Sequence, residues 1–298
     1  MTPERIGQTA ESQTAQVRAF WQGLGLPGLI DVHVHFMPPN VLAKVWAFFE
    51  RGHAGRPWPM VYKQPEDELV ELLRAFGVLR FGALPYPHKP DMAAWLNDWS
   101  AGFAARTPDA VHSATFFPEP GVLCYVTKAI ESGARLFKSH LQVGGYDPRH
   151  ELLDPVWGLL AQAGVPVVVH CGSAPYPASC TGPGPIGEVL ARHPRLLMIV
   201  AHLGGPEYGA FLDLADRYPG VHLDTTMAFT DFMNDIAPFP DELLPRLEDA
   251  GDRIVLGTDF PSIPYPYAHQ LRALARTGLG DDWLRAVCYA NPARLLGL

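Results

Sequence analysis

The chain has 298 residues, of which 48% are hydrophobic and 18% charged, and its formal net charge at pH 7 is -8. This composition excludes a disordered or fibrous chain, and the acidic balance without a cluster of Lys or Arg argues against nucleic acid or an anionic membrane as a partner. The length suits two average domains or one α/β barrel.

The N-terminal segment MTPERIGQTAESQTAQ is polar and lacks the apolar run of a secretory signal, so we expect a cytoplasmic protein. The four cysteines lie far apart and form no C-x-x-C pair, which indicates neither a thiolate zinc site nor a disulfide framework. Residues 13–25, QTAQVRAFWQGLG, predict a helix that packs against the outside of the following domain or plugs one end of it. We therefore expect an N-terminal helical extension over residues 1–27.

Short β-rich runs and helical patterns then alternate along the chain. Each β-rich run is closed by Gly, Pro, Ser or Thr; the eight runs are GLIDVHVHF, VLRFGALPY, HSATFFP, ARLFKSH, VPVVVHCG, LLMIVAHLG, VHLDTT and RIVLGTDF. The patterns between them, such as PEDELVELLRAFG and ELLDPVWGLLAQAG, are helical and several end in Gly. This order predicts an α/β fold, a single-domain (β/α)8 TIM barrel over residues 28–298, with residues 51–65 as a loop over the barrel mouth.

The first β-rich run places three polar side chains in an apolar strand. Because successive side chains of a strand point to opposite faces, Asp31, His33 and His35 are expected to share one face. Buried polar groups need partners. The two histidines are either core residues bonded to backbone carbonyls or part of a metal site.

Polar titratable residues recur at the ends of the predicted strands. Catalytic residues of a (β/α)8 barrel lie at these carboxyl ends. Only the second and third runs lack such a residue; the others carry His33 and His35, Lys138 and His140, His170, His202, His222 and Asp224, and Asp259. Three or four His and Asp ligands with an open position describe a catalytic divalent metal site, typically zinc. The clustering therefore favours the metal site over core histidines.

Five of these segments, DVHVH, VVVHCG, IVAHLGG, VLGTDFP and the closing NPARLLGL, together resemble the amidohydrolase superfamily. The resemblance spans residues 28–298, and the most similar branch is amidohydrolase-2, which includes aminocarboxymuconate-semialdehyde decarboxylase and related metal-dependent hydrolases. It implies that His33, His35, His170 and Asp259 bind metal and that Asp259 also hydrogen-bonds the activated water.

The resemblance gives His202 two possible roles. In mononuclear members of the branch the matching histidine is a general acid/base near the water, and this is the role we expect. In binuclear members of the superfamily it binds a second metal, and a carboxylated lysine bridges the two ions. The implied cofactor is one divalent metal ion, Zn²⁺ first, with Mn²⁺ or Fe²⁺ as alternatives and a binuclear site left open.

Further residues are candidates for substrate binding. Lys138 could be a carboxylated bridge, an ammonium that holds a substrate carboxylate, or the partner of an interior acid such as Asp31 or Asp224. His140 is expected in the substrate pocket. Asp224 could contact substrate, orient a neighbour or be a satisfied core residue.

Tyr-Pro pairs repeat in three loops that follow predicted strands. Tyr86, Tyr176 and Tyr265 could surround a small planar or aromatic carboxylate. The alternative is that the prolines only stiffen exposed loops. Tyr176 is the tyrosine that we assign to substrate binding.

The sequence thus predicts a metal-dependent hydrolase that cleaves a C–N or C–O bond of a small, possibly aromatic or carboxylated substrate. The alternative is a non-oxidative decarboxylase of an aromatic or dienoic acid, which would use the same ligands with a carboxylate-binding cation such as Lys138, Arg56 or Arg149. A non-catalytic barrel is a third hypothesis, and it predicts a degraded ligand set, which this sequence does not have. A small molecule is the expected partner, and a homodimer is possible.

Overall fold

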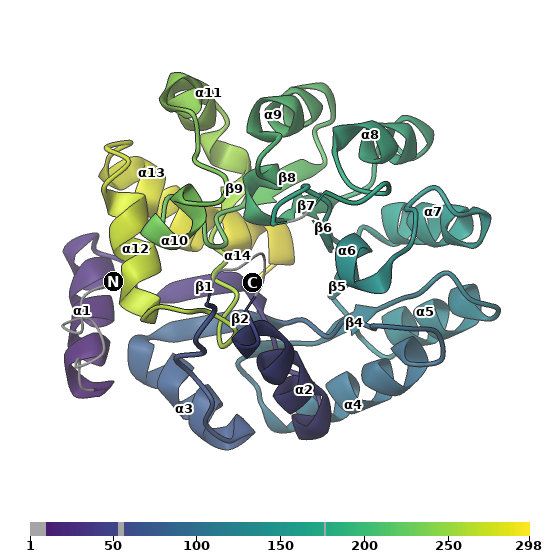
Figure 1. The fold of residues 1–298 in the computed structure, drawn as a ribbon, viewed down its shortest axis with the longest axis horizontal. Helices are drawn as coiled ribbons and strands as arrows, with labels where there is room; N and C mark the ends of the chain where they lie inside the picture. Colours follow the sequence, from purple (N-terminus) through teal and green to yellow (C-terminus); the bar gives the residue numbers. More distant parts are fainter. Residues whose placement is uncertain (1–9, 53–56, 176) are drawn as a thin grey trace.

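Parallel strands surrounded by helices form the protein in the computed structural model, which describes residues 10–52, 57–175 and 177–298 (Figure 1). The strands are β1 Leu29–Val34, β2 Val78–Ala83, β3 Ala110–Val111, β4 Ser113–Thr115, β5 Leu136–His140, β6 Val167–His170, β7 Met198–Val200, β8 Val221–Asp224 and β9 Ile254–Val255. All neighbouring strands pair in parallel, in the orders β1-β2-β3 and β4-β5-β6-β7-β8-β9. The predicted strand order is confirmed.

Two junctions join these sheets into a barrel. His112 separates β3 from β4, so these two segments together form the third strand. At the other junction the N–H of Val32 donates to the carbonyl of Leu256 at 2.9 Å and the N–H of Asp259 donates to that of His33, also at 2.9 Å. These bonds connect the last strand to the first, and the predicted (β/α)8 barrel is confirmed.

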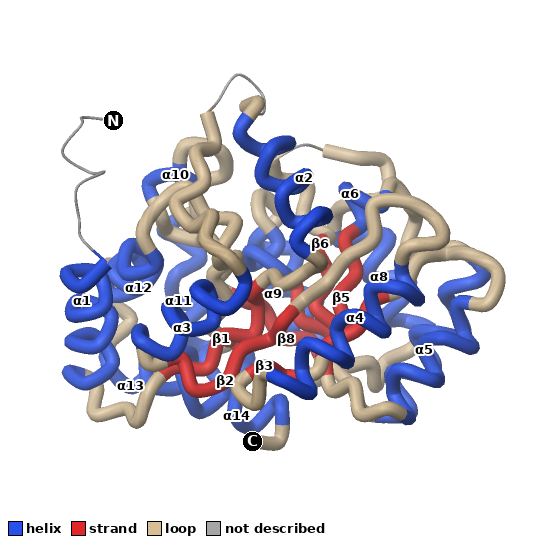
Figure 2. The backbone as a smooth tube through the Cα atoms, turned by 90° about the horizontal axis from the view of Figure 1, so that it is seen from below, coloured by secondary structure: helices blue, strands red, loops and turns tan. Residues whose placement is uncertain are grey.

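Helices cover the outside of the barrel and both of its ends (Figures 1 and 2). The α-helices are α1 Ala10–Gly23, α2 Pro39–Glu50, α3 Glu66–Phe76, α4 Ala93–Arg106, α5 Val122–Glu131, α6 Leu141–Gly144, α7 Asp154–Ala163, α8 Pro183–Arg192, α9 Tyr208–Arg217, α10 Asp231–Asn234, α11 Leu244–Asp249, α12 Tyr267–Ala275, α13 Asp281–Arg285 and α14 Asn291–Leu296. The helical patterns named above match α3 and α7; α3 is followed by its cap residue Gly77, which adopts the left-handed conformation with a φ of 83°. Helix α1 contacts α3 and α12 on the outside of the barrel, one of the two expected positions.

Helix α2 is an element that the sequence analysis did not predict. It follows β1 and lies beyond the carboxyl ends of the strands, whereas α14 lies beyond the opposite end (Figure 2). Its residues Val41, Leu42 and Val45 pack with Met37 and Tyr86 in a cluster of their own at the mouth. The first βα connection therefore contains the helix α2, which covers the mouth, in addition to the predicted loop. Among the described residues, no helix is long and apolar enough to cross a membrane.

A register shift between Asp31 and Val34 interrupts the alternation of side chains along β1. Val32 packs with Val168 and Ile199 of other strands, and its neighbour His33 lines the cavity at the mouth. Asp31 instead accepts hydrogen bonds from the hydroxyls of Thr258 and Tyr267, at 2.6 and 2.9 Å. The expectation that Asp31 shares a face with His33 and His35 is wrong, because the irregularity shifts the two-residue period between them.

Candidate active site

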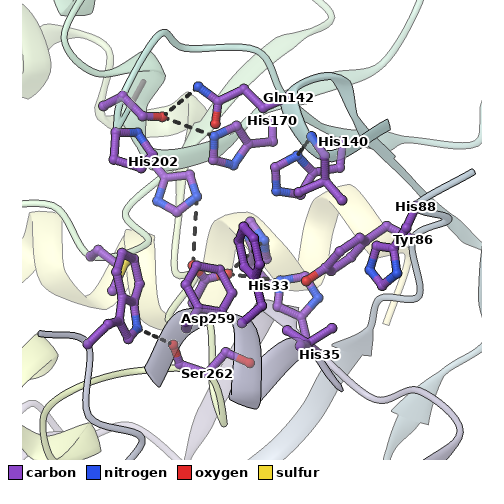
Figure 3. A pocket seen from close by; sticks show the side chains of 18 of the residues that line it. His33, His35, Tyr86, His88, His140, Gln142, His170, His202, Asp259 and Ser262 are labelled. Carbon is purple, nitrogen blue, oxygen red and sulfur yellow. Dashed lines mark hydrogen bonds and ion pairs between the residues drawn. The ribbon is translucent and has the colours of Figure 1, made fainter. Parts of the chain in front are cut away.

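A cavity of about 550 Å³ opens at the carboxyl ends of the strands. Predicted polar residues line its floor; they come from β1, β5 and β6 and from the segments that follow β1, β7 and β9 (Figure 3). They are His33, His35, Lys138, His140, His170, His202 and Asp259. Side chains from distant parts of the chain therefore meet as the barrel rule requires.

His33 of β1 and His35, which directly follows this strand, point the same ring nitrogen, Nε2, toward one carboxylate oxygen. Nδ1 of His33 lies 2.8 Å from Oδ2 of Asp224, and Nδ1 of His35 lies 2.9 Å from the carbonyl of Leu84. When Nδ1 donates to these acceptors, Nε2 of each ring keeps its lone pair. Both Nε2 atoms approach Oδ1 of Asp259, at 3.1 and 2.9 Å. Two nitrogen atoms with free lone pairs, the Nε2 atoms of His33 and His35, thus lie close to one carboxylate oxygen of Asp259.

Asp259 follows β9 in a backbone conformation that is uncommon for its residue type. Its φ is 68°, in the left-handed region. Its N–H donates to the carbonyl of His33, and its carbonyl accepts the N–H of Ser262 at 2.8 Å. These bonds hold the turn that aims its carboxylate at the histidines. The predicted eighth strand, RIVLGTDF, includes Asp259, but β9 ends at Val255, so Asp259 lies in the segment that follows the strand.

His202 lies on a similar turn after β7. Its φ is 57°, that of Leu203 is 52°, and the N–H of His202 donates to Oδ1 of Asp224 at 2.9 Å. Nε2 of His202 lies 3.8 Å from Oδ2 of Asp259. Ligand atoms of His33, His202 and Asp259 all lie within 4.8 Å of one another, a spacing that could hold a metal ion. His202 is therefore near enough for either role that the resemblance implies.

Asp224 is fully buried and is not among the cavity-lining residues. One of its carboxylate oxygens faces His33, and the other accepts N–H groups of His202 and Thr226. Of the alternatives left open by the sequence, these contacts favour the one in which Asp224 orients its neighbours rather than contacts substrate.

Lys138 is fully buried on the floor of the cavity, with Nζ 2.8 Å from Nε2 of His33. Burial lowers its pKa to about 8, although the carboxylates of Asp259 and Asp224 partly oppose the shift. Asp31, one interior acid proposed for it, uses its carboxylate on Thr258, Tyr267 and the backbone of His33. The ammonium therefore faces the cavity and the candidate ligands.

His170 and His140 form a stacked pair, with ring centroids 4.1 Å apart and planes 10° apart. Nε2 of His170 lies 3.2 Å from the carbonyl of Ala174, and its ring is 4.7 Å from that of His202. Both residues line the cavity, and that His140 contacts substrate there stays a prediction. That His170 binds metal stays a prediction, because its Nε2 faces a carbonyl here.

Burial sets the protonation of these groups. It lowers the pKa of His33 to about 4 and holds the pKa values of His140 and His170 well below the usual range. Burial opposes ionisation of Asp259, but the neighbouring His33, His202 and His35 outweigh it and hold its pKa well below the usual value. Unprotonated imidazoles beside an ionised carboxylate are the donors that a divalent cation requires. The residues therefore fit a metal ion.

The three loop tyrosines have different positions. Tyr86 lines the cavity and its ring lies 5.0 Å from those of His35 and His140 (Figure 3). The hydroxyl of Tyr265 donates to the side chain of Gln270 at 3.1 Å, and this tyrosine is not among the lining residues. Tyr176, assigned above to substrate binding, lies outside the described residues.

The outer part of the cavity consists of residues that the sequence analysis missed. Its apolar residues come from α2, from α10 and from loops far apart in the chain; they are Val45, Phe48, Phe49, Trp58, Met227, Met233 and Ile236. A helical reading of residues 39–50 could have found the first three. Trp58 lies in the predicted loop over the mouth, whereas Met227, Met233 and Ile236 carry no local signal, because only the fold brings them to the mouth.

The family model described as Amidohydrolase matches residues 30–298. Among solved structures, an uncharacterized TIM-barrel protein from Bordetella bronchiseptica is 18% identical with a TM-score of 0.72, over 90% of this chain and 99% of that one. A probable 2-pyrone-4,6-dicarboxylic acid hydrolase from Acinetobacter baumannii is 12% identical with a TM-score of 0.60, over 91% and 100%. A 5-carboxyvanillate decarboxylase from Novosphingobium aromaticivorans with bound manganese is 15% identical with a TM-score of 0.58, over 92% and 99%. No curated protein matches the sequence.

Proposed function

The chain belongs to the amidohydrolase family, and from that premise we propose that it is a metal-dependent hydrolase that cleaves a C–N or C–O bond of a small aromatic or carboxylated substrate. The observation that carries this proposal is the convergence of Nε2 of His33, Nε2 of His35 and Oδ1 of Asp259 on the cavity floor. A metal ion held there would supply Lewis acidity, which lowers the pKa of water or polarises a carbonyl.

Residues of the chain would bind the ion and carry out the proton transfers. His33 and His35 would hold the ion through Nε2, because their Nδ1 atoms are engaged by Asp224 and by the carbonyl of Leu84. Asp259 would bind the ion and accept the proton of the attacking water. His202, whose Nε2 lies 3.8 Å from Oδ2 of Asp259, would pass that proton on to the leaving group as general acid.

The ion is Zn²⁺ first in this proposal, since imidazole nitrogen and carboxylate oxygen both suit it. Mn²⁺ and Fe²⁺ are the alternatives. The manganese bound to one decarboxylase of the same fold supports Mn²⁺ as an alternative. His170 is the fourth ligand that we propose, which requires its Nε2 to leave the carbonyl of Ala174.

Lys138 favours a second candidate function, the non-oxidative decarboxylation of an aromatic or dienoic acid. Its ammonium faces the cavity and is buried, where it could hold a substrate carboxylate beside the metal site. Arg149, another cation considered for this role, is exposed and pairs with Asp147 and Glu188. Arg56 lies outside the described residues.

Metal content per chain, measured by elemental analysis on protein purified without chelator, tests the metal site. We expect about one ion in the wild type and in the control His150→Ala, which alters an exposed histidine, and loss of the ion and of turnover in His33→Ala. A wild-type chain that binds neither zinc, manganese nor iron on reconstitution would overturn the proposal.

Reaction in oxygen-labelled water, with a panel of amides, lactones and aromatic acids, separates the two reactions. Label in the organic product supports hydrolysis, whereas release of carbon dioxide together with an unlabelled organic product supports decarboxylation.

A further inference from the structure

The cavity is lined by more basic than acidic residues, although the protein as a whole is acidic. The chain as a whole has a net charge of -8. Of the described residues that line the cavity, Asp259 is the only carboxylate, whereas Lys44, Arg51 and Lys138 are basic. A metal ion on the floor would add further positive charge. A concave site with this excess of cations attracts an anionic ligand.

Two of these cations lie at the outer rim on one helix. Lys44 is in α2 and Arg51 follows its last residue, seven positions later, which is about two helical turns and places both on the same side. Both are exposed and both line the cavity. The guanidinium Nε donates to the carbonyl of Ala47 at 3.1 Å, which leaves its other N–H groups for a ligand.

No described carboxylate neutralises this rim. Glu50, the acidic residue of α2, pairs with Lys63 at 2.7 Å, and Lys63 is not a cavity-lining residue. Within the described chain, neither Lys44 nor Arg51 has an acidic partner.

Aromatic side chains separate the rim from the floor. Trp58 contacts Phe49 at a ring-centroid distance of 4.7 Å and is fixed by a 3.0 Å hydrogen bond from its Nε1 to the carbonyl of Ser262. Phe48 and Tyr86 also line this part of the cavity, and Phe48 is 48% exposed. A flat apolar body would find aromatic faces here.

We propose that Lys44 and Arg51 are specificity-determining residues, and that the substrate is an aromatic compound with an anionic group at the end remote from the reacting centre. This inference rests on the proposed function, because it takes the cavity as the substrate site and the floor as the reacting end. The ring lies between Trp58 and Tyr86, and the remote anion binds the two cations of α2.

Equilibrium binding to the metal-reconstituted full chain tests the inference. The probes are two matched pairs that differ in length, benzoate with terephthalate, and biphenylcarboxylate with its para,para-dicarboxylate. Calorimetry should show that at least one diacid binds roughly tenfold or more tightly than its monoacid in low salt. In the double variant Lys44→Gln/Arg51→Gln this advantage should vanish while the Kd of the monoacid stays unchanged.

The matched control is Lys89→Gln, which removes one positive charge at an exposed position after β2; Lys89 itself does not line the cavity, although its neighbour His88 does. It should preserve the advantage of the diacid, and 0.5 M salt should reduce that advantage by screening. The inference is overturned if no diacid is favoured, if neither pair binds, if the advantage survives the double variant, or if the control abolishes it. Because binding needs no turnover, these outcomes are separate from loss of metal or activity in His33→Ala, which tests the proposed function.

Discussion

Oδ2 of Asp224 lies 2.8 Å from Nδ1 of His33, and both side chains are fully buried. The second oxygen of the same carboxylate accepts the N–H of His202. One buried group on β8 therefore fixes the ring of a candidate metal ligand and the backbone of the candidate acid. Its own burial opposes ionisation, but its interaction with His33, which includes their hydrogen bond, and with His202 holds the pKa of Asp224 well below the usual range.

Asp224→Asn should weaken metal binding by roughly 10- to 100-fold, because the amide no longer favours the tautomer of His33 with its proton on Nδ1. Titration of the metal against a competing chelator measures the change. Asp213→Asn, which alters an exposed carboxylate on α9, is the control and should bind as the wild type does. Equal affinities of Asp224→Asn and wild type would contradict the orienting role.

His202→Asn should retain the metal and reduce turnover by roughly 10²- to 10⁴-fold, the range for loss of a general acid. Asn tolerates the left-handed conformation of this position, so the turn is preserved. Metal analysis and kcat on the same preparation measure the two effects. Loss of the ion would instead make His202 a ligand, as the grouping with His33 and Asp259 allows.

Lys138→Met should keep the ion content of the wild type at about one per chain and bind the ion at least as tightly, because a positive charge beside His33 is removed. Elemental analysis in the presence of bicarbonate gives the stoichiometry. Two ions in the wild type and one in the variant would instead identify Lys138 as a carboxylated bridge.

Asp31→Asn should gain stability relative to the wild type as pH rises. Burial raises the pKa of Asp31 to about 7, partly offset by its hydrogen bonds from Thr258, His33 and Tyr267. The folded state thus keeps a proton that the unfolded chain loses near pH 4, so the wild type becomes less stable as pH rises from about 4 to about 7.

Urea unfolding of the metal-free protein at several pH values measures this difference, which should reach a few kcal/mol. Asp98→Asn, an exposed substitution, controls for the change in net charge. A difference between Asp31→Asn and the wild type that does not vary with pH would refute the prediction.

Tyr62→Phe should lower the free energy of unfolding by about 1–3 kcal/mol. The buried hydroxyl accepts the N–H of Tyr267 at 2.7 Å and donates to the side chain of Gln13, which connects α1 to α12. Without it a buried N–H has no partner. The control is Tyr289→Phe, because the hydroxyl of Tyr289 has no hydrogen bond within the described chain, and it should change the free energy of unfolding less. Equal effects of the two substitutions in urea unfolding would count against a stabilising role of the Tyr62 hydroxyl between α1 and α12.

The sequence alone determined the barrel and its family. The periodicity of apolar residues in strands and helices is a local property of the sequence. The alternation of runs such as VPVVVHCG with helical patterns therefore predicts the fold without knowledge of tertiary contacts. The barrel rule then placed His33, His170, His202 and Asp259 at one end. The structure brings these residues to one cavity, while their catalytic and metal-binding roles stay predictions.

Tertiary structure decided which polar groups face that cavity. The irregularity in β1 turned Asp31 toward Tyr267, and Asp224 was placed behind His33 instead of in the cavity. Lys44 and Arg51 also line the cavity only because α2 lies over its mouth in the folded protein. A two-residue period cannot reveal a register shift, and no local pattern records a contact across 191 residues such as that of His33 with Asp224. Such relations depend on barrel closure, which only the whole chain specifies.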